Sequence, residues 1–437
     1  MADEQVRRRI EAVWRIEAAK IIGGVARVIR DVGLAEDLAQ EAFVAALEHW
    51  PREGLPQNPG AWLMATAKNR ALDALRQRAL HARKREELGA DADARGDHVV
   101  PDFSDALDAA RDDYGDDLLR LVFAACHPVL GREGQLALTL KLLCGLSTAE
   151  IARAFVVPEP TITQRIVRAK RTLAEARVPF EVPRGEALEK RLAVVLEVIY
   201  LLFNEGYSAT LGADWMRPAL CEEAMRLGRV LAALTPHEAE VHGLVALMEI
   251  QASRTRARTD AAGRPILLLE QDRSHWDRLL IGRGLAALAH AAALPAGDGG
   301  PYALQAAIAA CHARAATAAE TDWPRIVALY DRLLVHLPSP VVRLNRAVAL
   351  GMASGPAVAL PLVDALGAMA QMQRYHLLHA VRGDLLARLG RHREATLAFE
   401  RAAELTGNER ERALMTERAR DTAGLSHLSR PQPTDGP

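Results

Sequence analysis

The segment 135–176, QLALTLKLLCGLSTAEIARAFVVPEPTITQRIVRAKRTLAEA, decides how the first part of the chain folds. Its apolar residues recur at the spacing of amphipathic helices, and two short breaks divide it into three helices. Gly145 is typical of the residue that follows a helix end. Ser147 and Glu150 form a capping box, in which each side chain bonds the other residue's backbone N–H group. Val156–Glu159 is predicted to be the turn, with Pro160 opening the third helix.

The third helix of this segment carries a predicted buried stripe, formed by Ile162, Ile166, Ala169 and Leu173. In a helix-turn-helix motif the start of the second motif helix enters the major groove of DNA. We therefore expect contacts to base edges near its start and contacts to phosphates further along. An ordinary basic surface helix is the alternative. The expected DNA-binding residues are Thr161, Thr163, Gln164, Arg165, Arg168, Lys170 and Arg171.

The whole chain has 437 residues and a net charge of −1. Half of the residues are hydrophobic, mostly Ala and Leu, and only 4% are aromatic, which favours an all-α fold over an all-β one. The near-neutral charge hides an acidic segment, 89–117, with a net charge of −8, and a basic one, 118–185, with +5. We expect the acidic segment to be a flexible, solvated linker.

The head of the chain is predicted to hold two helices, the first over 34–49 and the second after a loop over Pro51–Pro59. The second helix carries aromatic and polar side chains on one face at spacings of three and four residues. Such a face can bind single-stranded nucleic acid by stacking and polar contacts. Its members are Trp62, Thr66, Asn69, Asp73 and Arg76.

Five runs of sequence resemble the extracytoplasmic-function (ECF) sigma factors of bacterial RNA polymerase. The runs Asp37–Phe43 (D-x-x-Q-E-x-F), Asn58–Leu63 (N-P-x-A-W-L) and Asn69–Asp73 (N-x-x-x-D) resemble region 2 of this family. The runs Gly145–Ala152 (G-L-S-x-x-E-I-A) and Thr161–Lys170 (T-I-x-x-R-I-x-R-A-K) resemble region 4. The resemblance covers about the first 180 residues of the chain.

This resemblance implies that the chain binds core RNA polymerase, at the β′ clamp and the β flap, and promoter DNA. The polymerase-binding residues would be Asp37, Gln40 and Glu41. The Pro51–Pro59 loop would capture a flipped base of the −10 element, and the Trp62 face would melt and hold that element. The third helix of region 4 would read the −35 element. The acidic linker would run toward the RNA path of the polymerase, with a plain tether as the alternative.

One departure from the family pattern lies in the turn before the third helix, at Pro158–Pro160. Family members usually have a small residue and then glycine there, whereas this chain has Glu159. A carboxylate near a helix N-terminus suits the helix dipole but repels phosphate.

The body of the chain, residues 186–437, carries no net charge and reads as stacked helix pairs with a period of about 34 residues. The segment 376–409 has the pattern of a tetratricopeptide-like hairpin, 307–340 matches its second helix, and 341–374 is a weaker copy. Stacked repeats present a concave surface suited to a regulatory protein or peptide. The expected domains are region 2 (1–88), the acidic linker (89–117), region 4 (118–180), a helical extension (181–306), tetratricopeptide-like repeats (307–425) and a disordered tail (426–437).

No feature of the sequence predicts an enzyme, a cofactor or a metal site. The four cysteines, Cys126, Cys144, Cys221 and Cys311, lack metal-ligand spacing. The polar runs 204–207 and 272–277 are expected to cap helices or to bond between them. Without a secretory signal or a membrane segment, the chain is expected to be cytoplasmic, and nucleoid-associated when bound to polymerase.

The sequence thus predicts a sigma factor that directs polymerase to a dedicated gene set, with a helical body that modulates it. Two alternatives stay open. One is a helix-turn-helix regulator that acts without polymerase, and the other is a repeat-based adaptor. The head of the chain favours the sigma factor, because a regulator that binds only duplex DNA has no use for the Asp37–Phe43 helix or the Trp62 face.

Overall fold

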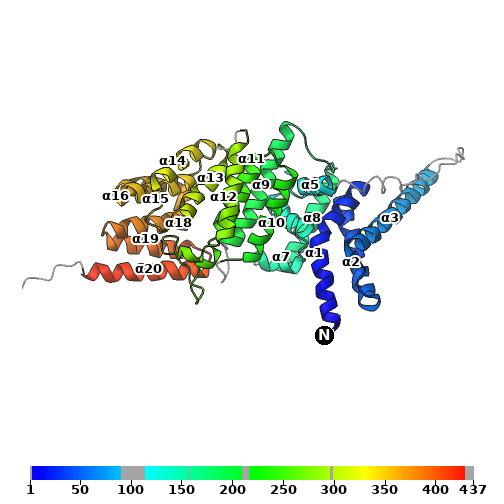
Figure 1. The fold of residues 1–437 in the computed structure, drawn as a ribbon, viewed down its shortest axis with the longest axis horizontal. Helices are drawn as coiled ribbons and strands as arrows, with labels where there is room; N and C mark the ends of the chain where they lie inside the picture. The colour runs from blue at the N-terminus through cyan, green and yellow to red at the C-terminus, as the bar shows by residue number, and fades with distance from the viewer. Residues whose placement is uncertain (1, 90–113, 156, 209–215, 296–298, 429–437) are drawn as a thin grey trace, which may run out of the picture. The chain divides into compact units, whose positions relative to one another are not determined.

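The computed structural model describes residues 2–89, 114–155, 157–208, 216–295 and 299–428. Within these ranges the chain is helical, without strands, which confirms the predicted all-α class (Figure 1). The chain divides into two compact units, residues 1–199 and residues 200–437. The head and the basic module both lie in the first unit, and most of the body forms the second.

Three helices build the head: α1 (Ala2–Ile29), α2 (Val32–Glu53) and α3 (Pro59–Gly89). Asp31 caps α2, because its Oδ1 accepts a hydrogen bond of 3.0 Å from the backbone N–H of Leu34. Helix α2 is longer than the sequence predicted and includes Pro51 in its last turn. The loop before α3 is therefore shorter than expected, at residues 54–58, and Gly54 opens it with a φ of +88°.

The helix-turn-helix segment has the predicted three helices with small shifts of their boundaries. The first begins three residues early and ends in a π-helical turn, and Gly145 follows with the left-handed φ of +65°. The third begins at Glu159, one residue early, and its four predicted stripe residues are all at most 6% exposed. The helices of this module are α5 (Tyr114–Ala125), α6 (Arg132–Leu138), the π turn (Thr139–Leu143), α7 (Thr148–Phe155) and α8 (Glu159–Glu175).

The acidic segment is shorter than predicted at its C-terminal end. Residues 90–113 lie outside the described part of the chain, but Asp117 is in helix α5 and only 3% exposed. Its carboxylate accepts a hydrogen bond of 2.7 Å from Arg120 and forms an ion pair of 3.5 Å with Arg27. Asp117 is therefore a buried anchor between α1 and α5, because two arginines compensate its charge.

Helix α9 (Glu186–Tyr207) begins in the first unit and ends in the second. Its first half packs on the basic module, where Arg191 Nη2 donates a hydrogen bond of 2.6 Å to the carbonyl of Phe123. The other helices of the second unit are α10 (Pro218–Leu234), α11 (Ala239–Ala252), α12 (Arg278–Ala293), α13 (Pro301–Arg314), α14 (Trp323–His336), α15 (Pro340–Ser354), α16 (Pro356–Gly367), α17 (Ala370–Gln373), α18 (His376–Arg388), α19 (His392–Leu405) and α20 (Glu409–Leu428).

The helix pair predicted over 376–409 is present as α18 and α19. Gly383 lets the two helices approach, because a Cβ atom there would lie 2.8 Å from the ring of Phe399. Phe399 itself is fully buried, and Gly390 has the left-handed φ of +73° that the turn between the helices requires. Helix α20 continues to Leu428, so the predicted tail begins later than expected, and residues 429–437 lie outside the described part.

The two polar runs of the body serve as helix caps and ion pairs. Asp277 caps α12 by accepting hydrogen bonds from the N–H groups of Leu279 and Leu280, at 2.9 and 3.1 Å. Asp272 caps the short 3-10 helix Arg273–His275, which precedes α12. Its Oδ1 accepts a hydrogen bond of 2.8 Å from the backbone N–H of Ser274. In the other run Glu205 forms an ion pair with Arg217. The predicted capping role is thus confirmed for both aspartates.

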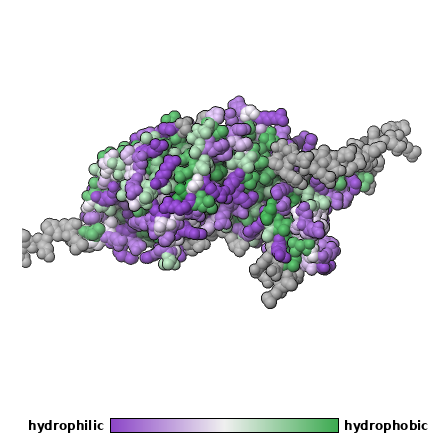
Figure 2. Space-filling model, viewed as in Figure 1, coloured by the Kyte–Doolittle hydropathy of each residue, from purple (hydrophilic) through white to green (hydrophobic). Residues whose placement is uncertain are grey.

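On the face in Figure 2, hydrophilic residues are spread over both units with apolar residues between them. Among the described residues no helix is both long and apolar enough to cross a bilayer. Nor, within those same ranges, are three His, Cys, Asp or Glu side chains grouped so that they could hold a metal ion.

His312 makes the stability of the second unit dependent on pH. It is 8% exposed, and burial lowers its pKa to about 4, with Arg254 and Arg273 adding to the shift. Between its ordinary pKa of 6.5 and about 4, the unfolded chain takes up a proton that the folded chain does not, so stability falls as the pH falls. We expect a loss of about 2 kcal/mol between pH 7 and pH 5, measured by urea unfolding. His312→Phe should remove that part of the pH dependence, and an unchanged dependence would contradict the assignment.

Candidate nucleic-acid interface

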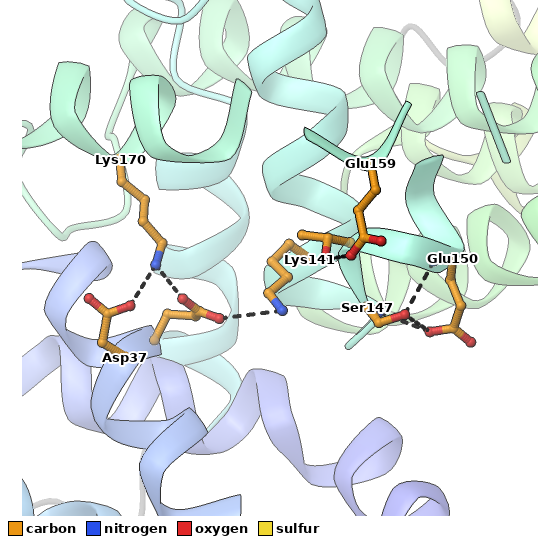
Figure 3. Close-up of polar contacts among 8 residues, drawn as sticks. Asp37, Lys141, Ser147, Glu150, Glu159 and Lys170 are labelled. Carbon is orange, nitrogen blue, oxygen red and sulfur yellow. Dashed lines mark hydrogen bonds and ion pairs between the residues drawn. The ribbon is translucent and has the colours of Figure 1, made fainter. Parts of the chain in front are cut away.

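The capping box at the start of α7 is formed as predicted (Figure 3). The backbone N–H of Ser147 donates to Glu150 Oε2 at 2.9 Å, and the N–H of Glu150 donates to Ser147 Oγ at 3.2 Å. Burial alone would raise the pKa of Glu150, but the bonds from Ser147 and the charge of Arg15 lower it overall. The carboxylate is therefore ionised at neutral pH and holds the first turn of α7.

Glu159, the residue that departs from the family pattern, ties the two helices of the motif together. Thr148 Oγ1, at the start of α7, donates a hydrogen bond of 2.9 Å to Glu159 Oε1, at the start of α8 (Figure 3). Glu159 remains exposed. The side chain thus links the start of α7 to the start of α8.

Helix α8 turns part of its predicted DNA-binding set to solvent. Thr163, Gln164 and Arg168 are exposed, and Thr161 is half-buried. Arg165 forms an ion pair of 2.9 Å with Glu133, whose side chain is 70% exposed. Arg171 pairs with Glu175 one turn further, at 2.6 Å. The Arg171–Glu175 pair is exposed on both sides and contributes little free energy, whereas the Arg165 side chain is only 25% exposed in its pair with Glu133.

Lys170 differs from the rest of this set, because its ammonium group faces the head and is only 17% exposed. Its Nζ donates to Glu36 and, at 2.9 Å, to Asp37 on helix α2 (Figure 3). Burial opposes the charged form, but the two carboxylates outweigh it and raise the pKa of Lys170. In this arrangement Lys170 is paired with the head, so it is not placed to contact a phosphate of bound DNA as the sequence predicted.

The contact with Lys170 also buries Glu36. The sequence did not predict a role for this residue. Glu36 is 3% exposed, and its second oxygen lies 3.7 Å from Lys141 Nζ. A further ion pair joins Arg15 of α1 to the capping-box residue Glu150. The head and the helix-turn-helix module are therefore packed together through charged groups of opposite sign. The only signal in the sequence is an acid flanked by the apolar positions of α2.

The predicted −10 face lies along α3. Asn69, Asp73 and Arg76 are exposed, with Asp73 and Arg76 paired at 3.2 Å, whereas Trp62 and Thr66 are half-buried. The Trp62 ring packs edge-on against Trp50, at 5.4 Å between centroids, and Trp50 is 2% exposed. Trp62 is therefore held by the core on one side, while the polar members of the face are open to solvent.

The three predicted polymerase-binding residues follow one another along α2 with different surroundings. Asp37 is exposed but bonded to Lys170, as described above. Glu41 is exposed and pairs with Arg70 of α3 at 2.5 Å. Gln40 is half-buried between them. The structure brings these residues to one edge of the head, next to the contact with the helix-turn-helix module.

Comparison with known proteins matches the two modules separately. Residues 17–80 match Sigma-70 region 2, and residues 122–173 match Sigma-70 region 4. The ECF RNA polymerase sigma factor SigC of Mycobacterium tuberculosis is 31% identical over 37% of this chain and 75% of its own length. The chain belongs to the ECF sigma factors.

This sigma factor initiates transcription, and its region 2 and region 4 imply core RNA polymerase and promoter DNA as partners. Proteins of this class are generally not enzymes. A second relative, the probable ECF RNA polymerase sigma factor SigI of Mycobacterium tuberculosis, is 27% identical over 40% of this chain and 57% of its own length.

Beyond the sigma regions, residues 191–292 match a family of unknown function, DUF6596. An uncharacterised protein of Rhizobium meliloti, R00370, is 45% identical over 90% of both chains, so it shares the long helical extension as well. No solved structure matches this chain.

Proposed function

We propose that this sigma factor recognises the −35 element with α8 and opens the −10 element with the exposed face of α3. The observation that carries the first assignment is a helix-turn-helix whose capping box and Thr148–Glu159 bond fix α8, with Gln164 and Arg168 exposed along it. The second rests on the open polar row Asn69, Asp73 and Arg76 beside the half-buried Trp62.

The packed arrangement of the two regions has to open before both elements can be bound. Elements about 25 base pairs apart lie roughly 80 Å apart along B-form DNA. In the structure Lys170 of α8 is bonded directly to Asp37 of α2. We infer that binding of core polymerase, which would engage Asp37, Gln40 and Glu41 through its β′ clamp, competes with Lys170 for the same carboxylates. The β flap would then hold region 4.

Arg165 and Arg168 form a matched pair for testing the −35 assignment. Arg165→Ala should lower promoter-specific transcription and relax selection at one −35 position by about 1–3 kcal/mol, because arginine reads guanine with two hydrogen bonds. Arg168→Ala should weaken binding to all sequences about equally, because a phosphate contact carries no base information. Binding to a library of −35 sequences measures both effects. An unaltered sequence profile for Arg165→Ala would remove that residue from base readout.

Asp37 tests the polymerase-binding edge. Asp37→Arg should reduce co-purification with core polymerase at least tenfold, because it places a cation where an acid is expected to bind the clamp. Glu48→Arg is the control, because Glu48 is exposed on the same helix α2 and its substitution changes the charge by the same amount. Equal recovery of polymerase by both variants would argue against the assignment.

We also propose that the helical body modulates the sigma activity, by holding a regulatory protein or peptide, and has no catalysis of its own. Support comes from the stacked helix pairs, such as α18 and α19, which expose apolar side chains including Leu377 and Leu397. The protein would act on a dedicated gene set and lie at the nucleoid while bound to polymerase.

A further inference from the structure

A cavity of about 720 Å³ lies where the corner between α1 and α2 meets the end of α8. Its size is that of pockets that hold small molecules. Basic side chains outnumber acidic ones in its lining, which belongs entirely to the first unit. The charged residues around it are Arg27, Arg30, Arg120, Lys170 and Arg177, with the acids Asp31 and Glu181. We call it the junction cavity.

The positive charge of the junction cavity is not cancelled by its ion pairs. Lys170 is balanced by the acids of α2, Asp31 lies 3.7 Å from Arg78, and Glu181 also interacts with Arg191. Arg27 and Arg120 share the single carboxylate of Asp117.

Arg30 and Arg177 make no ion pair with any described residue, and both are exposed at the rim of the junction cavity. Each of these two guanidinium groups therefore carries a positive charge that a ligand can neutralise.

Two independent features of the backbone and the donors point to a bound anion. Arg30 and Arg177 have left-handed φ values of +56° and +48°, and they are the only residues besides glycine with positive φ in the described part of the chain. Both arginines lie just past the ends of helices α1 and α8, where glycine or asparagine usually takes the left-handed position that ends a helix, so arginine is present at both places against its backbone preference. In addition, Arg27 Nη2 is buried and has no hydrogen-bond partner among the described residues.

We propose that the junction cavity binds a small compound with two or more linked phosphate groups. Arginine guanidinium groups present paired donors that match phosphate oxygens, and several of them around one cavity suit a chain of phosphates better than a single carboxylate. Residues of region 2 and of the end of α8 both line the cavity, so it exists only while the two regions are packed together. The ligand therefore stabilises the packed arrangement and opposes its opening.

The test measures binding of inorganic tripolyphosphate to the full-length protein by titration calorimetry at 0.1 M salt. The wild type should bind with a stoichiometry of one. Arg30→Ala and Arg177→Ala should each weaken binding at least fivefold, whereas Arg278→Ala should leave it unchanged. Arg278 is the control because it is also exposed at a helix end but lies in the second unit. Absence of binding, or equal affinity of all four proteins, overturns the proposal.

Two further arms distinguish the source of the phosphates and the link to function. If the cavity instead tracks the DNA backbone, Arg30→Ala and Arg177→Ala weaken binding to a short duplex, and tripolyphosphate affinity does not change; this result overturns the small-ligand assignment. The effect of the ligand on transcription rests on the proposed function. Tripolyphosphate should reduce transcription by the wild type but not by the two variants. The variants should remain active without ligand, so a protein inactive under all conditions would mark failure of the proposed function rather than of the cavity.

Discussion

Glu36→Lys should lower the free energy of unfolding of the first unit by about 3–5 kcal/mol, the usual cost of leaving a buried charge without its partner. Glu36 is 3% exposed and lies between Lys141 and Lys170, so a lysine there places three ammonium groups together in a site that excludes water. We expect the contact between α2 and α8 to open before the helices themselves unfold. Urea unfolding, together with fluorescence energy transfer between labels on α3 and α8, measures both effects.

A charge exchange provides the control for this variant. Glu36→Lys combined with Lys170→Glu restores a pair of opposite charges and should recover part of the lost stability and of the energy transfer. Asp37→Asn removes the other carboxylate on Lys170, but that side chain is 63% exposed, so we expect a change of about 1 kcal/mol or less. A Glu36→Lys protein as stable and as compact as the wild type would show that the buried contact does not hold the two regions together.

Phe399→Ala should lower the free energy of unfolding of the second unit by about 3–5 kcal/mol. The ring is fully buried, Gly383 packs directly on it, and the guanidinium carbon of Arg418 lies 4.4 Å from its centroid. Truncation leaves a cavity that the backbone of α18 cannot close, because Gly383 has no side chain to fill it. Thermal unfolding followed by circular dichroism should show a lower transition temperature for the second unit alone.

Leu397→Ala is the matched control for Phe399→Ala, because Leu397 lies on the same helix but is 61% exposed. We expect it to change stability by about 0.5 kcal/mol or less. Transcription by the Phe399→Ala protein then tests the proposed modulation. Promoter activity that differs from that of the wild type supports a role of the helical body, and wild-type activity would argue that the body acts independently.

Local patterns predicted most of the fold, because they depend on neighbours in the sequence. The capping box of Ser147 and Glu150 and the left-handed Gly145 follow from backbone groups that must be bonded at helix ends. The buried stripe of α8 follows from helical periodicity. In the body, the helix pair predicted over 376–409 rests on the same kind of pattern and is present as α18 and α19.

Contacts between distant segments could not be predicted, because no local pattern specifies them. Lys170 was expected at a phosphate, yet its partner Glu36 lies 134 positions away in the sequence. Asp117 looked like one more acid of a flexible linker, and only the approach of Arg27 from α1 makes it a buried anchor. The sequence shows that Lys170 is basic and Asp117 acidic, but it does not show their partners. Those partners depend on how the head packs against the helix-turn-helix module.

The most direct test of the sigma assignment is transcription in vitro with purified core RNA polymerase on genomic DNA, with and without this protein, followed by sequencing of the RNA 5′ ends. We predict a discrete set of start sites that requires the protein, with a shared sequence upstream at the −10 and −35 positions. The Asp37→Arg protein should lose this set, and the Glu48→Arg protein should keep it. Start sites identical to those of core polymerase alone would contradict the account.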